Sequence, residues 1–306
     1  MTTVSRIQLG PEGPQFSRLV WGTMRINQDV DSQNPRDLLG KIEECLAVGV
    51  TTFDHADIYG DHSCEALFGN ALAEKPQLRQ HIQLISKCGI MPISDNRPGR
   101  WVKHYDTSAG HIIGSVETSL RNLRTDYLDL LLIHRPDPLM DAEETAGALT
   151  RLRAEGKIRH YGVSNFSPWQ FDLLQSRLDA PLVTNQVELS VLNPITLHNG
   201  ILDQCQRLGI RPMAWSPLGG NALFFGDDQR VERVRQILKR VAGELGVQGI
   251  DQVALAWVLR HPARPLPVLG TNRIARIHTL AQAENLAMDR QQWFAILEAA
   301  MGHPVA

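Results

Sequence analysis

The sequence contains little cysteine, no long apolar run and no block of like charge. Its four cysteines are scattered and form no CxxC pair: Cys45, Cys64, Cys88 and Cys205. A disulfide framework or a structural zinc site is therefore not expected, and a reducing cytoplasm fits this composition. No apolar stretch approaches the ~20 residues of a membrane-spanning helix, and the start MTTVSRIQLGPEG lacks the apolar core of a secretory signal. We therefore expect a cytoplasmic protein that does not enter a membrane.

Charge is balanced along the chain, with 31 Lys and Arg against 33 Asp and Glu and a formal net charge of -2. No basic run favours a nucleic acid as partner. His55 and His62 have no third ligand at a suitable spacing, so no metal site is expected. The composition is globular, 43% hydrophobic and 21% charged, over 306 residues. The lack of a linker, solenoid repeat or low-complexity tract predicts a single domain over residues 1–306.

Eight short apolar runs alternate with longer amphipathic segments. Continuous apolar runs are typical of strands that are buried on both faces. The expected strands are residues 18–21, 51–55, 82–86, 128–133, 158–163, 182–187, 210–215 and 265–269. Strands that alternate with helices indicate a parallel sheet, and eight strands can close around an interior filled with side chains. The sequence therefore predicts an α/β fold of the (β/α)₈ TIM-barrel type.

Helical periodicity is clearest over residues 111–124 and weaker over 141–155, which ends before Gly156. Ser167 and Pro168 are typical of the cap and first residue of another helix. Two features lie outside the simple alternation of strands and helices. Residues 5–17 are expected to form a hairpin before the first barrel strand. Residues 275–283 and 290–300 are expected to form extra C-terminal helices.

Every expected strand ends in residues that can hydrogen-bond, ionise or stack. In chain order these are Gly22, Thr23 and Met24; Asp54 and then Tyr59; Lys87; His134; Ser164 and Asn165; Gln186; Trp215 and Ser216; and Gly270, Thr271 and Asn272. In a TIM barrel the active site lies at the carboxyl ends of the strands. Since only this rim converges on one cavity, we expect the active site there.

Asp54, Tyr59, Lys87 and His134 form a coherent set for chemistry at a carbonyl group. Hydride delivery to the carbonyl carbon leaves negative charge on the oxygen, which needs a proton. Tyrosine is a weak acid with an ordinary pKa of about 10, and a Lys87 ammonium nearby is expected to lower that pKa. Asp54 would keep Lys87 charged, and His134 would donate a hydrogen bond to the carbonyl oxygen. Each residue alone is usually structural, but a shared rim favours catalysis.

Several segments carry a resemblance to the aldo-keto reductase family, and to its bacterial general oxidoreductases in particular. They are FDHADIYG (53–60), LISKCG (84–89), LDLLLIHRPD (128–137), GKIRHYGVSNF (156–166), MAWSPLGG (213–220) and the ending DRQQWFAILEAAMG. The resemblance covers nearly the whole chain. It implies a barrel that binds NADP(H) without a Rossmann domain and that reduces small aldehydes or ketones. The lack of GxGxxG after any expected strand agrees with this.

The resemblance also implies a role for each rim residue. The implied catalytic tetrad is Asp54, Tyr59, Lys87 and His134, with Tyr59 as general acid and with Tyr59 and His134 touching the substrate. The implied nicotinamide contacts are Ser164, Asn165, Gln186 and, stacked on the ring, Trp215. Gly22, Thr23, Met24 and Asp54 are further expected cofactor contacts. The implied phosphate contacts are Ser216, Leu218 and Gly219 at the pyrophosphate, and Gly270, Thr271, Asn272, Arg273 and Arg276 at the adenosine 2′-phosphate.

Two departures from the family's pattern bear on the choice of cofactor. Gly270 stands where many relatives have Lys, and Leu280 replaces an Asn that often contacts adenine. Arg273 or Arg276 remains available to pair with the 2′-phosphate. Barrels often bind phosphate after the last two strands. NADP(H) is therefore the expected cofactor.

The substrate side is expected to involve the long loop over residues 89–110. Trp101 and Tyr105 would form an apolar wall, and Arg97 or Arg100 would attract an acidic substrate. The alternative is a solvated loop that makes no contact with the substrate. The expected partner is a small carbonyl compound, and the family resemblance implies a monomer.

Two other functions remain open from the sequence. One is a regulatory subunit that keeps the cofactor and the tetrad but turns over very slowly while it binds another protein. The other is a barrel isomerase or lyase that uses the phosphate site alone, which would leave Trp215, Asn165 and Gln186 without a task. Turnover and nicotinamide binding distinguish these alternatives from a reductase.

Overall fold

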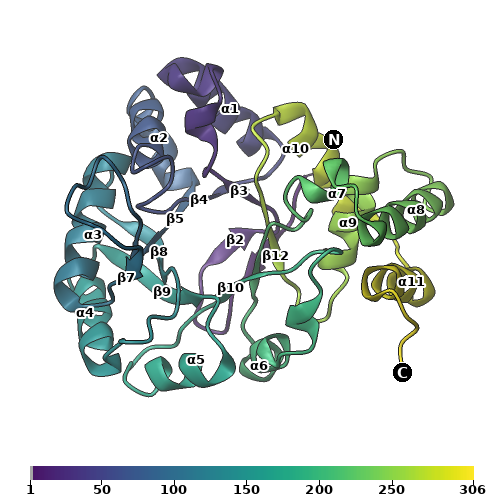
Figure 1. The fold of residues 1–306 in the computed structure, drawn as a ribbon. Helices are drawn as coiled ribbons and strands as arrows, with labels where there is room; N and C mark the ends of the chain where they lie inside the picture. The colour runs from purple at the N-terminus through teal and green to yellow at the C-terminus, as the bar shows by residue number, and fades with distance from the viewer. Residues whose placement is uncertain (1–2) are drawn as a thin grey trace.

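The chain folds into a closed barrel of eight parallel strands inside a ring of helices, viewed along the barrel in Figure 1. The computed structural model describes residues 3–306. The barrel strands are β3 (Val20–Gly22), β4 (Thr52–Asp54), β5 (Gln83–Cys88), β8 (Leu128–Ile133), β9 (Ile158–Ser164), β10 (Asn185–Glu188), β11 (Met213–Trp215) and β12 (Leu266–Leu269). The expected (β/α)₈ barrel is confirmed.

Each expected strand overlaps an observed one, but two of them begin three residues late. β11 begins at Met213 and not at residue 210, since Pro212 has no N–H to give to the sheet and the N–H of Arg211 donates to the carbonyl of Leu9. β10 begins at Asn185 and not at residue 182. Short apolar runs thus mark the strands, while the backbone partners at their amino ends decide where pairing starts.

The expected N-terminal hairpin is present as β1 (Arg6–Gln8) and β2 (Gln15–Ser17), which pair antiparallel. Its apolar side chains Ile7, Leu9 and Phe16 are buried together with residues of the barrel interior. The interior side chains in this cluster are Val20, Ile85, Leu130, Leu132, Val183, Met213, Leu266 and Val268. The hairpin therefore closes the amino end of the barrel, and the carboxyl end is left for ligands.

A helix follows each barrel strand. The ring consists of α1 (Pro35–Ala47), α2 (Cys64–Ala73), α3 (Ala109–Leu123), α4 (Ala142–Ala154), α5 (Pro168–Gln175), α6 (Ile201–Leu208), α9 (Ile250–Leu259) and α10 (Ile274–Ala281). Short 3-10 turns lie at η1 (Ile26–Gln28), η2 (Asp31–Gln33), η3 (Pro76–His81), η4 (Ile195–Leu197) and η5 (Gln282–Asn285). No helix within residues 3–306 has both the length and the apolar character needed to cross a membrane.

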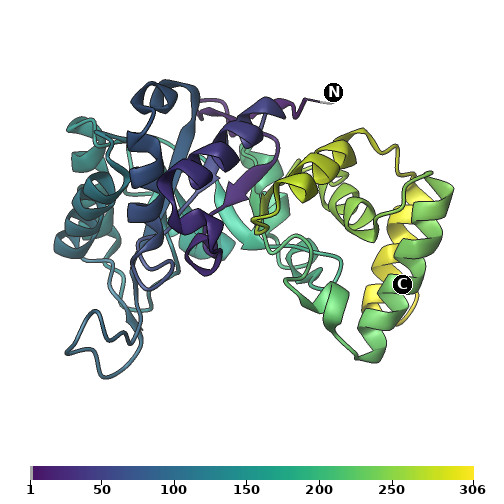
Figure 2. The same ribbon diagram turned by 90° about the horizontal axis from the view of Figure 1, so that it is seen from above.

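The C-terminal helical patterns resolve into one ring helix and one extra helix. The pattern over residues 275–283 corresponds to α10, which follows the last barrel strand and completes the ring. The pattern over 290–300 forms α11 (Arg290–Met301) outside the ring. There α11 packs against α8 (Gln229–Glu244), which together with α7 (Ala222–Phe225) is inserted between β11 and α9. Figure 2 shows α8 and α11 side by side on the outer flank.

Local capping explains where the expected helices begin. Ser167 and Gln170 form a capping box at α5, with Pro168 as the first helical residue, as the sequence predicts. α3 begins at Ala109, two residues before the expected start, because the Ser108 side chain accepts a hydrogen bond from the N–H of His111.

The loop after β5 leaves the barrel as a long excursion. β6 (Ile90–Met91) and β7 (His104–Tyr105) pair antiparallel at its base. The loop between them extends outward, toward the lower left of Figure 2, while its Ser94 and Asn96 side chains donate to Asp61 in the turn after β4. The base of this loop is therefore tied to the barrel while its tip is solvated.

Gly69 marks the closest approach of two ring helices. It is buried within α2, and a Cβ atom at this position would lie 1.9 Å from the carbonyl oxygen of Asn122 in α3. Gly147 offers a contrast, because it lies on the exposed face of α4 and a Cβ there would meet nothing within 4 Å. Glycine therefore permits the close packing of α2 against α3 at Gly69, whereas Gly147 gains no contact and only lowers the stability of α4.

We expect Gly69→Ala to lower the free energy of unfolding by about 1–3 kcal/mol, because α2 and α3 must separate to admit the methyl group. Gly147→Ala is the matched control and should raise it by about 0.5–1 kcal/mol. Urea unfolding followed by circular dichroism measures both. Equal effects of the two substitutions would contradict the close approach at Gly69.

Candidate active site

The acid–base residues come from three neighbouring strands at the carboxyl end of the barrel. Asp54 ends β4, Lys87 lies in β5 and His134 directly follows β8. Tyr59 lies in the turn after β4, where its N–H donates to the carbonyl of Ala56. Because β4 pairs with β5 and β5 pairs with β8, the register brings these side chains together.

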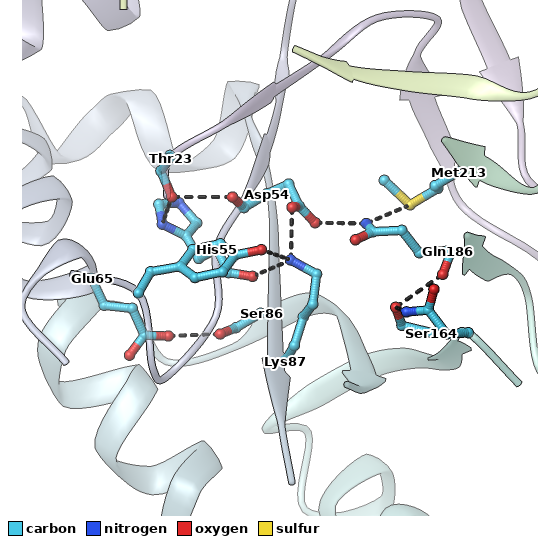
Figure 3. A network of polar contacts seen from close by, with 11 residues as sticks. Thr23, Asp54, His55, Glu65, Ser86, Lys87, Ser164, Gln186 and Met213 are labelled. Carbon is cyan, nitrogen blue, oxygen red and sulfur yellow. Dashed lines mark hydrogen bonds and ion pairs between the residues drawn. The ribbon is translucent and has the colours of Figure 1, made fainter. Parts of the chain in front are cut away.

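Lys87 is the centre of this group, and all its polar contacts are short. Its Nζ donates to Asp54 Oδ2 at 2.7 Å, to the carbonyl oxygen of His55 at 2.7 Å and to Tyr59 Oη at 3.0 Å. Figure 3 shows the ammonium between Asp54 and His55. The Lys87 and Asp54 side chains are 0% and 2% exposed. A fully buried ion pair of this kind persists only when its hydrogen bonds are satisfied, as they are here.

The environment sets the protonation of Lys87 and Tyr59. Burial opposes the charge on Lys87, but the Asp54 carboxylate and the Tyr59 hydroxyl outweigh it and raise the pKa of Lys87 above its ordinary value. Burial raises the pKa of Tyr59, and the Lys87 ammonium only partly opposes this. The Lys87 ammonium thus lowers the Tyr59 pKa as expected, but burial has the larger effect and the net pKa lies above the ordinary value. Tyr59 is a protonated phenol at neutral pH.

His134 lies edge-on to Tyr59, with the ring centroids 6.0 Å apart and an interplanar angle of 79°. It is 8% exposed, and its Nδ1 is buried without a hydrogen-bond partner among the described residues. Burial, with the positive charges of Lys87, Arg135 and Lys103, holds the pKa of His134 well below its ordinary value. The imidazole is therefore neutral and carries a single N–H.

A chain of hydrogen bonds runs from Asp54 across the mouth of the barrel. Gln186 Nε2 donates to Asp54 Oδ1 at 2.9 Å, and Ser164 Oγ donates to the backbone carbonyl oxygen of Gln186 at 2.9 Å (Figure 3). Asn165 Nδ2 donates to Ser164 Oγ at 2.7 Å, and Trp215 Nε1 donates to Asn165 Oδ1 at 3.0 Å. The chain fixes the Trp215 indole relative to the acid–base group.

One cleft of about 1250 Å³ joins these residues to the end of the last strand. Asp54, Tyr59 and His134 line it, whereas Lys87 lies beneath and reaches it only through its partners. The other expected residues that line the cleft are Gly22, Met24, Ser164, Asn165, Gln186, Trp215, Ser216, Leu218, Gly270, Thr271, Asn272, Arg273 and Arg276. The structure thus brings most of the expected cofactor residues to one continuous surface.

The far end of the cleft gathers guanidinium groups. Arg276 Nε donates to Asp251 Oδ2 at 2.9 Å, and its guanidinium lies 4.6 Å from the centroid of the Phe224 ring. This stacking joins the segment over residues 220–225 to α10. Arg25 follows the first barrel strand. It lines the cleft, and its Nη1 donates to the Gly270 carbonyl at 3.4 Å, which places a cation beside the glycine that replaces the family's lysine.

Besides Lys87, four expected site residues do not line the cleft. Thr23 is buried, and its hydroxyl contacts the Asp54 carbonyl and His55 Nδ1. Gly219 lies behind its neighbours, at a φ of 65° and against Leu192. Trp101 is 88% exposed on the projecting loop, and Tyr105 is held in β7 by pairing with Ile90. The expected apolar wall is therefore absent from the cleft, because the loop is anchored at its base and points outward.

His55 extends the buried network behind Asp54. Its Nδ1 lies 2.8 Å from Thr23 Oγ1, its ring meets Phe68 edge-on at 4.5 Å, and it is 0% exposed. Burial, followed by the Lys87 charge, lowers the pKa of His55 to about 3. The imidazole is thus kept neutral, next to a carbonyl that accepts from Lys87.

The comparisons with known proteins agree with this architecture. The model of the Aldo/keto reductase family matches residues 18–300. Oxidoreductase YdhF of Escherichia coli (strain K12) is 52% identical and covers 99% of both chains. The 6-dehydroglucose reductase of Agrobacterium fabrum is 51% identical over 95% of this chain and 97% of its own. The crystal structure of the thermostable aldo-keto reductase Tm1743 with the inhibitor epalrestat matches with a TM-score of 0.81 and 25% identity, over 96% of this chain and 99% of that one.

We expect His55 to make the protein sensitive to mild acid. Its folded pKa of about 3 lies below the unfolded value of 6.5. The unfolded state therefore binds more protons below pH 6.5, and stability falls as the pH falls. From pH 7.5 to 5 the loss due to His55 is about 2 kcal/mol. In urea unfolding at both pH values, His55→Asn should show a loss smaller by about that amount, and an unchanged loss would contradict the assignment.

Proposed function

This chain belongs to the aldo/keto reductase family, and from this premise we propose that it is an NADPH-dependent reductase of small carbonyl compounds with Tyr59 as general acid. Membership in the family makes it an oxidoreductase, while the cofactor, the acid and the substrate are our proposals. The observation that carries them is the 3.0 Å contact between Tyr59 Oη and Lys87 Nζ under the floor of the cleft.

The cleft fits a nicotinamide dinucleotide, since an indole lies near the acid–base group and guanidinium groups lie at the far end. Trp215 would stack on the nicotinamide ring, with Ser164, Asn165 and Gln186 at its carboxamide. Ser216, Leu218 and the segment that follows would hold the pyrophosphate. When bound, this cofactor supplies the hydride.

Tyr59 provides the proton for the carbonyl oxygen. Because burial keeps its pKa above the ordinary value, the phenol holds its proton until the substrate oxygen gains negative charge. Lys87 then stabilises the phenolate that is left, and Asp54 keeps Lys87 charged through their 2.7 Å contact. In this assignment Lys87 holds the Tyr59 hydroxyl in place through their 3.0 Å contact and favours the phenolate that the proton transfer leaves.

His134 orients the substrate. A neutral imidazole cannot compete with Tyr59 as an acid, but its one N–H can donate to the carbonyl oxygen. Tyr59 and His134 both line the cleft with their rings edge-on, which supports two donors that converge on one oxygen. Such paired donors also stabilise the charge that develops on that oxygen.

NADPH is favoured over NADH by the positive groups at the far end. Arg273 and Arg276 line the cleft there, with Thr271 and Asn272 beside them. Arg25 lies next to Gly270 and supports the same preference, since it supplies a cation where the family's lysine is missing. Guanidinium groups pair with a phosphate in a bidentate manner, which the ribose hydroxyl of NADH does not offer.

A polyhydroxylated aldehyde is the substrate that we propose to test first. The relative from Agrobacterium fabrum is named 6-dehydroglucose reductase. The cleft of this chain offers Gln28, Asp29 and Arg135 as hydrogen-bonding side chains outside the acid–base group. These groups suit hydroxyls better than an apolar carbonyl compound.

We further propose that residues 1–306 act as one domain, as a cytoplasmic monomer. One buried core that includes side chains from Val4 to Ala300 supports the single domain. A regulatory subunit with little turnover is the second candidate. A barrel isomerase or lyase is less well supported, because it gives the chain of contacts from Gln186 to Trp215 no task.

We expect the protein to oxidise NADPH with a panel of small aldehydes and ketones that includes 6-dehydroglucose, and Tyr59→Phe to lower kcat about 100- to 10,000-fold. The affinity for NADPH should stay nearly unchanged, because the substitution keeps the aromatic ring and removes only its hydroxyl group. The decrease in reduced-nicotinamide absorbance measures turnover, and fluorescence titration measures affinity.

Tyr105→Phe is the matched control, since it removes a phenol hydroxyl outside the cleft and should leave kcat unchanged. Comparable turnover by Tyr59→Phe would remove Tyr59 from its assigned role. Turnover of a single equivalent of NADPH with every compound would favour the regulatory subunit.

We expect Arg276→Ala to weaken NADPH binding about ten- to hundredfold, since charge-assisted hydrogen bonds to the 2′-phosphate are lost. NADH binding should change much less. The substitution also removes the stacking on Phe224, which would weaken both cofactors alike, so the ratio of the two dissociation constants is the measurement. An unchanged ratio would refute the 2′-phosphate assignment.

A further inference from the structure

A second cavity, of about 250 Å³, lies behind the turn that carries Tyr59. Its walls include Asp57 and His62 from that turn, Arg97 and Arg100 from the projecting loop, and His111 at the start of α3. Ile90 lines both this cavity and the cleft, so the two are neighbours. The proposed reduction uses none of the five polar side chains.

Four buried polar atoms in this cavity have no hydrogen-bond partner among residues 3–306. They are Asp57 Oδ1, His62 Nε2, Arg100 Nη1 and His111 Nε2. Buried polar groups in folded proteins are nearly always hydrogen-bonded. Four orphaned atoms around one space indicate that their partners belong to something held within it.

The tautomer of His62 shows that the partner must donate as well as accept. His62 Nδ1 lies 2.7 Å from the carbonyl oxygen of Asp57, which can only accept, so Nδ1 carries the proton. Burial, with Arg97 and Arg100 nearby, lowers the pKa of His62 and keeps the ring neutral. Its Nε2 is then a pure acceptor and needs a donor such as a hydroxyl group.

Arg97 and Arg100 require a partner that accepts hydrogen bonds, since a guanidinium group can only donate them. Arg97 and Arg100 form no salt bridge within the described part of the chain, and Arg100 Nη1 is one of the orphaned atoms. A guanidinium fork matches the oxygens of a phosphate or a carboxylate. One oxygen of each cavity carboxylate accepts from a serine, Asp57 Oδ2 from Ser115 at 2.8 Å and Glu65 Oε1 from Ser86 at 2.6 Å, and neither carboxylate forms a salt bridge with Arg97 or Arg100 within the described residues. An external anion is thus the group that these guanidinium groups fit.

Asp57 need not repel such an anion. Burial raises the pKa of Asp57 to about 7, so its carboxyl group is partly protonated near neutral pH and can donate to a ligand oxygen.

The cavity of about 250 Å³ is also larger than a bare ion would fill, because one water molecule takes up about 30 Å³ of the liquid.

We propose that this cavity binds a small anionic polyol, whose phosphate or carboxylate group pairs with Arg97 and Arg100 and whose hydroxyls meet Asp57, His62 and His111. The site is separate from the cleft. The site is nevertheless linked to the acid–base residues, because the backbone N–H of Asp57 donates to the backbone carbonyl of Lys87 at 3.0 Å. A bound polyol would brace the turn from which Tyr59 projects.

The test is calorimetric titration of the full chain with glucose 6-phosphate, gluconate, inorganic phosphate and uncharged glucose. We expect saturable binding of one or both anionic polyols, with inorganic phosphate and glucose at least tenfold weaker. The first two probes identify whether the anion is a phosphate or a carboxylate. Equal binding of inorganic phosphate and the polyols would reduce the site to an adventitious ion only and overturn the proposal, as would no binding at all.

Variants locate the binding within the molecule. Arg97→Gln with Arg100→Gln should weaken the anionic polyols about tenfold or more, through loss of charge-assisted hydrogen bonds. Arg230→Gln with Arg290→Gln, at two exposed positions far along the chain, is the control of equal charge and should change nothing. Gly114→Leu adds a side chain at the cavity where a Cβ has open space, and it should block binding, whereas Gly147→Leu on α4 should not.

The cleft offers its own guanidinium groups, so one more variant separates the two sites. Arg276→Ala should leave polyol binding intact. If that substitution abolishes binding while Arg97→Gln with Arg100→Gln does not, the polyol occupies the cofactor cleft and the proposal fails. These binding measurements do not depend on turnover, so their failure would leave the proposed reductase activity untouched, and the reverse also holds.

Discussion

The buried contact between Lys87 and Asp54 is the constraint on which the mouth of this barrel depends. An ammonium with no access to water must keep every hydrogen bond that it makes, and Lys87 makes three. Those bonds fix the end of β4, the backbone at His55 and the phenol of Tyr59. Asp54 also accepts from Gln186, which passes the same constraint through Ser164 and Asn165 to Trp215. One ion pair therefore sets the relative positions of the acid and the indole.

Much of this arrangement follows from the sequence. The eight apolar runs are short and regularly spaced, so they predict the barrel, and polar residues at their carboxyl ends must then converge on one rim. The sequence alone therefore predicts that Asp54, Lys87, His134 and Trp215 lie at that rim. Capping chemistry is equally local, and it correctly marks α5 at Ser167 and Pro168. The pattern over residues 275–283 is a helix as predicted, although α10 belongs to the ring.

The features that cannot be predicted from the sequence depend on contacts between distant segments. The outward path of the loop that carries Trp101 follows from the pairing of β6 with β7 and not from its composition. The contact of Arg25 with the Gly270 carbonyl exists because β3 lies beside β12 in the closed barrel. The raised pKa of Tyr59 reflects a balance between burial and the charge of Lys87, and a list of neighbours in the sequence does not reveal which one wins.

The hairpin at the amino end of the barrel restricts how ligands enter and leave. Ile7, Leu9 and Phe16 fill that end together with the interior side chains, so no path runs through the barrel. Whatever enters the cleft must leave by the same opening. A dinucleotide and a carbonyl compound would therefore enter and leave through that one opening.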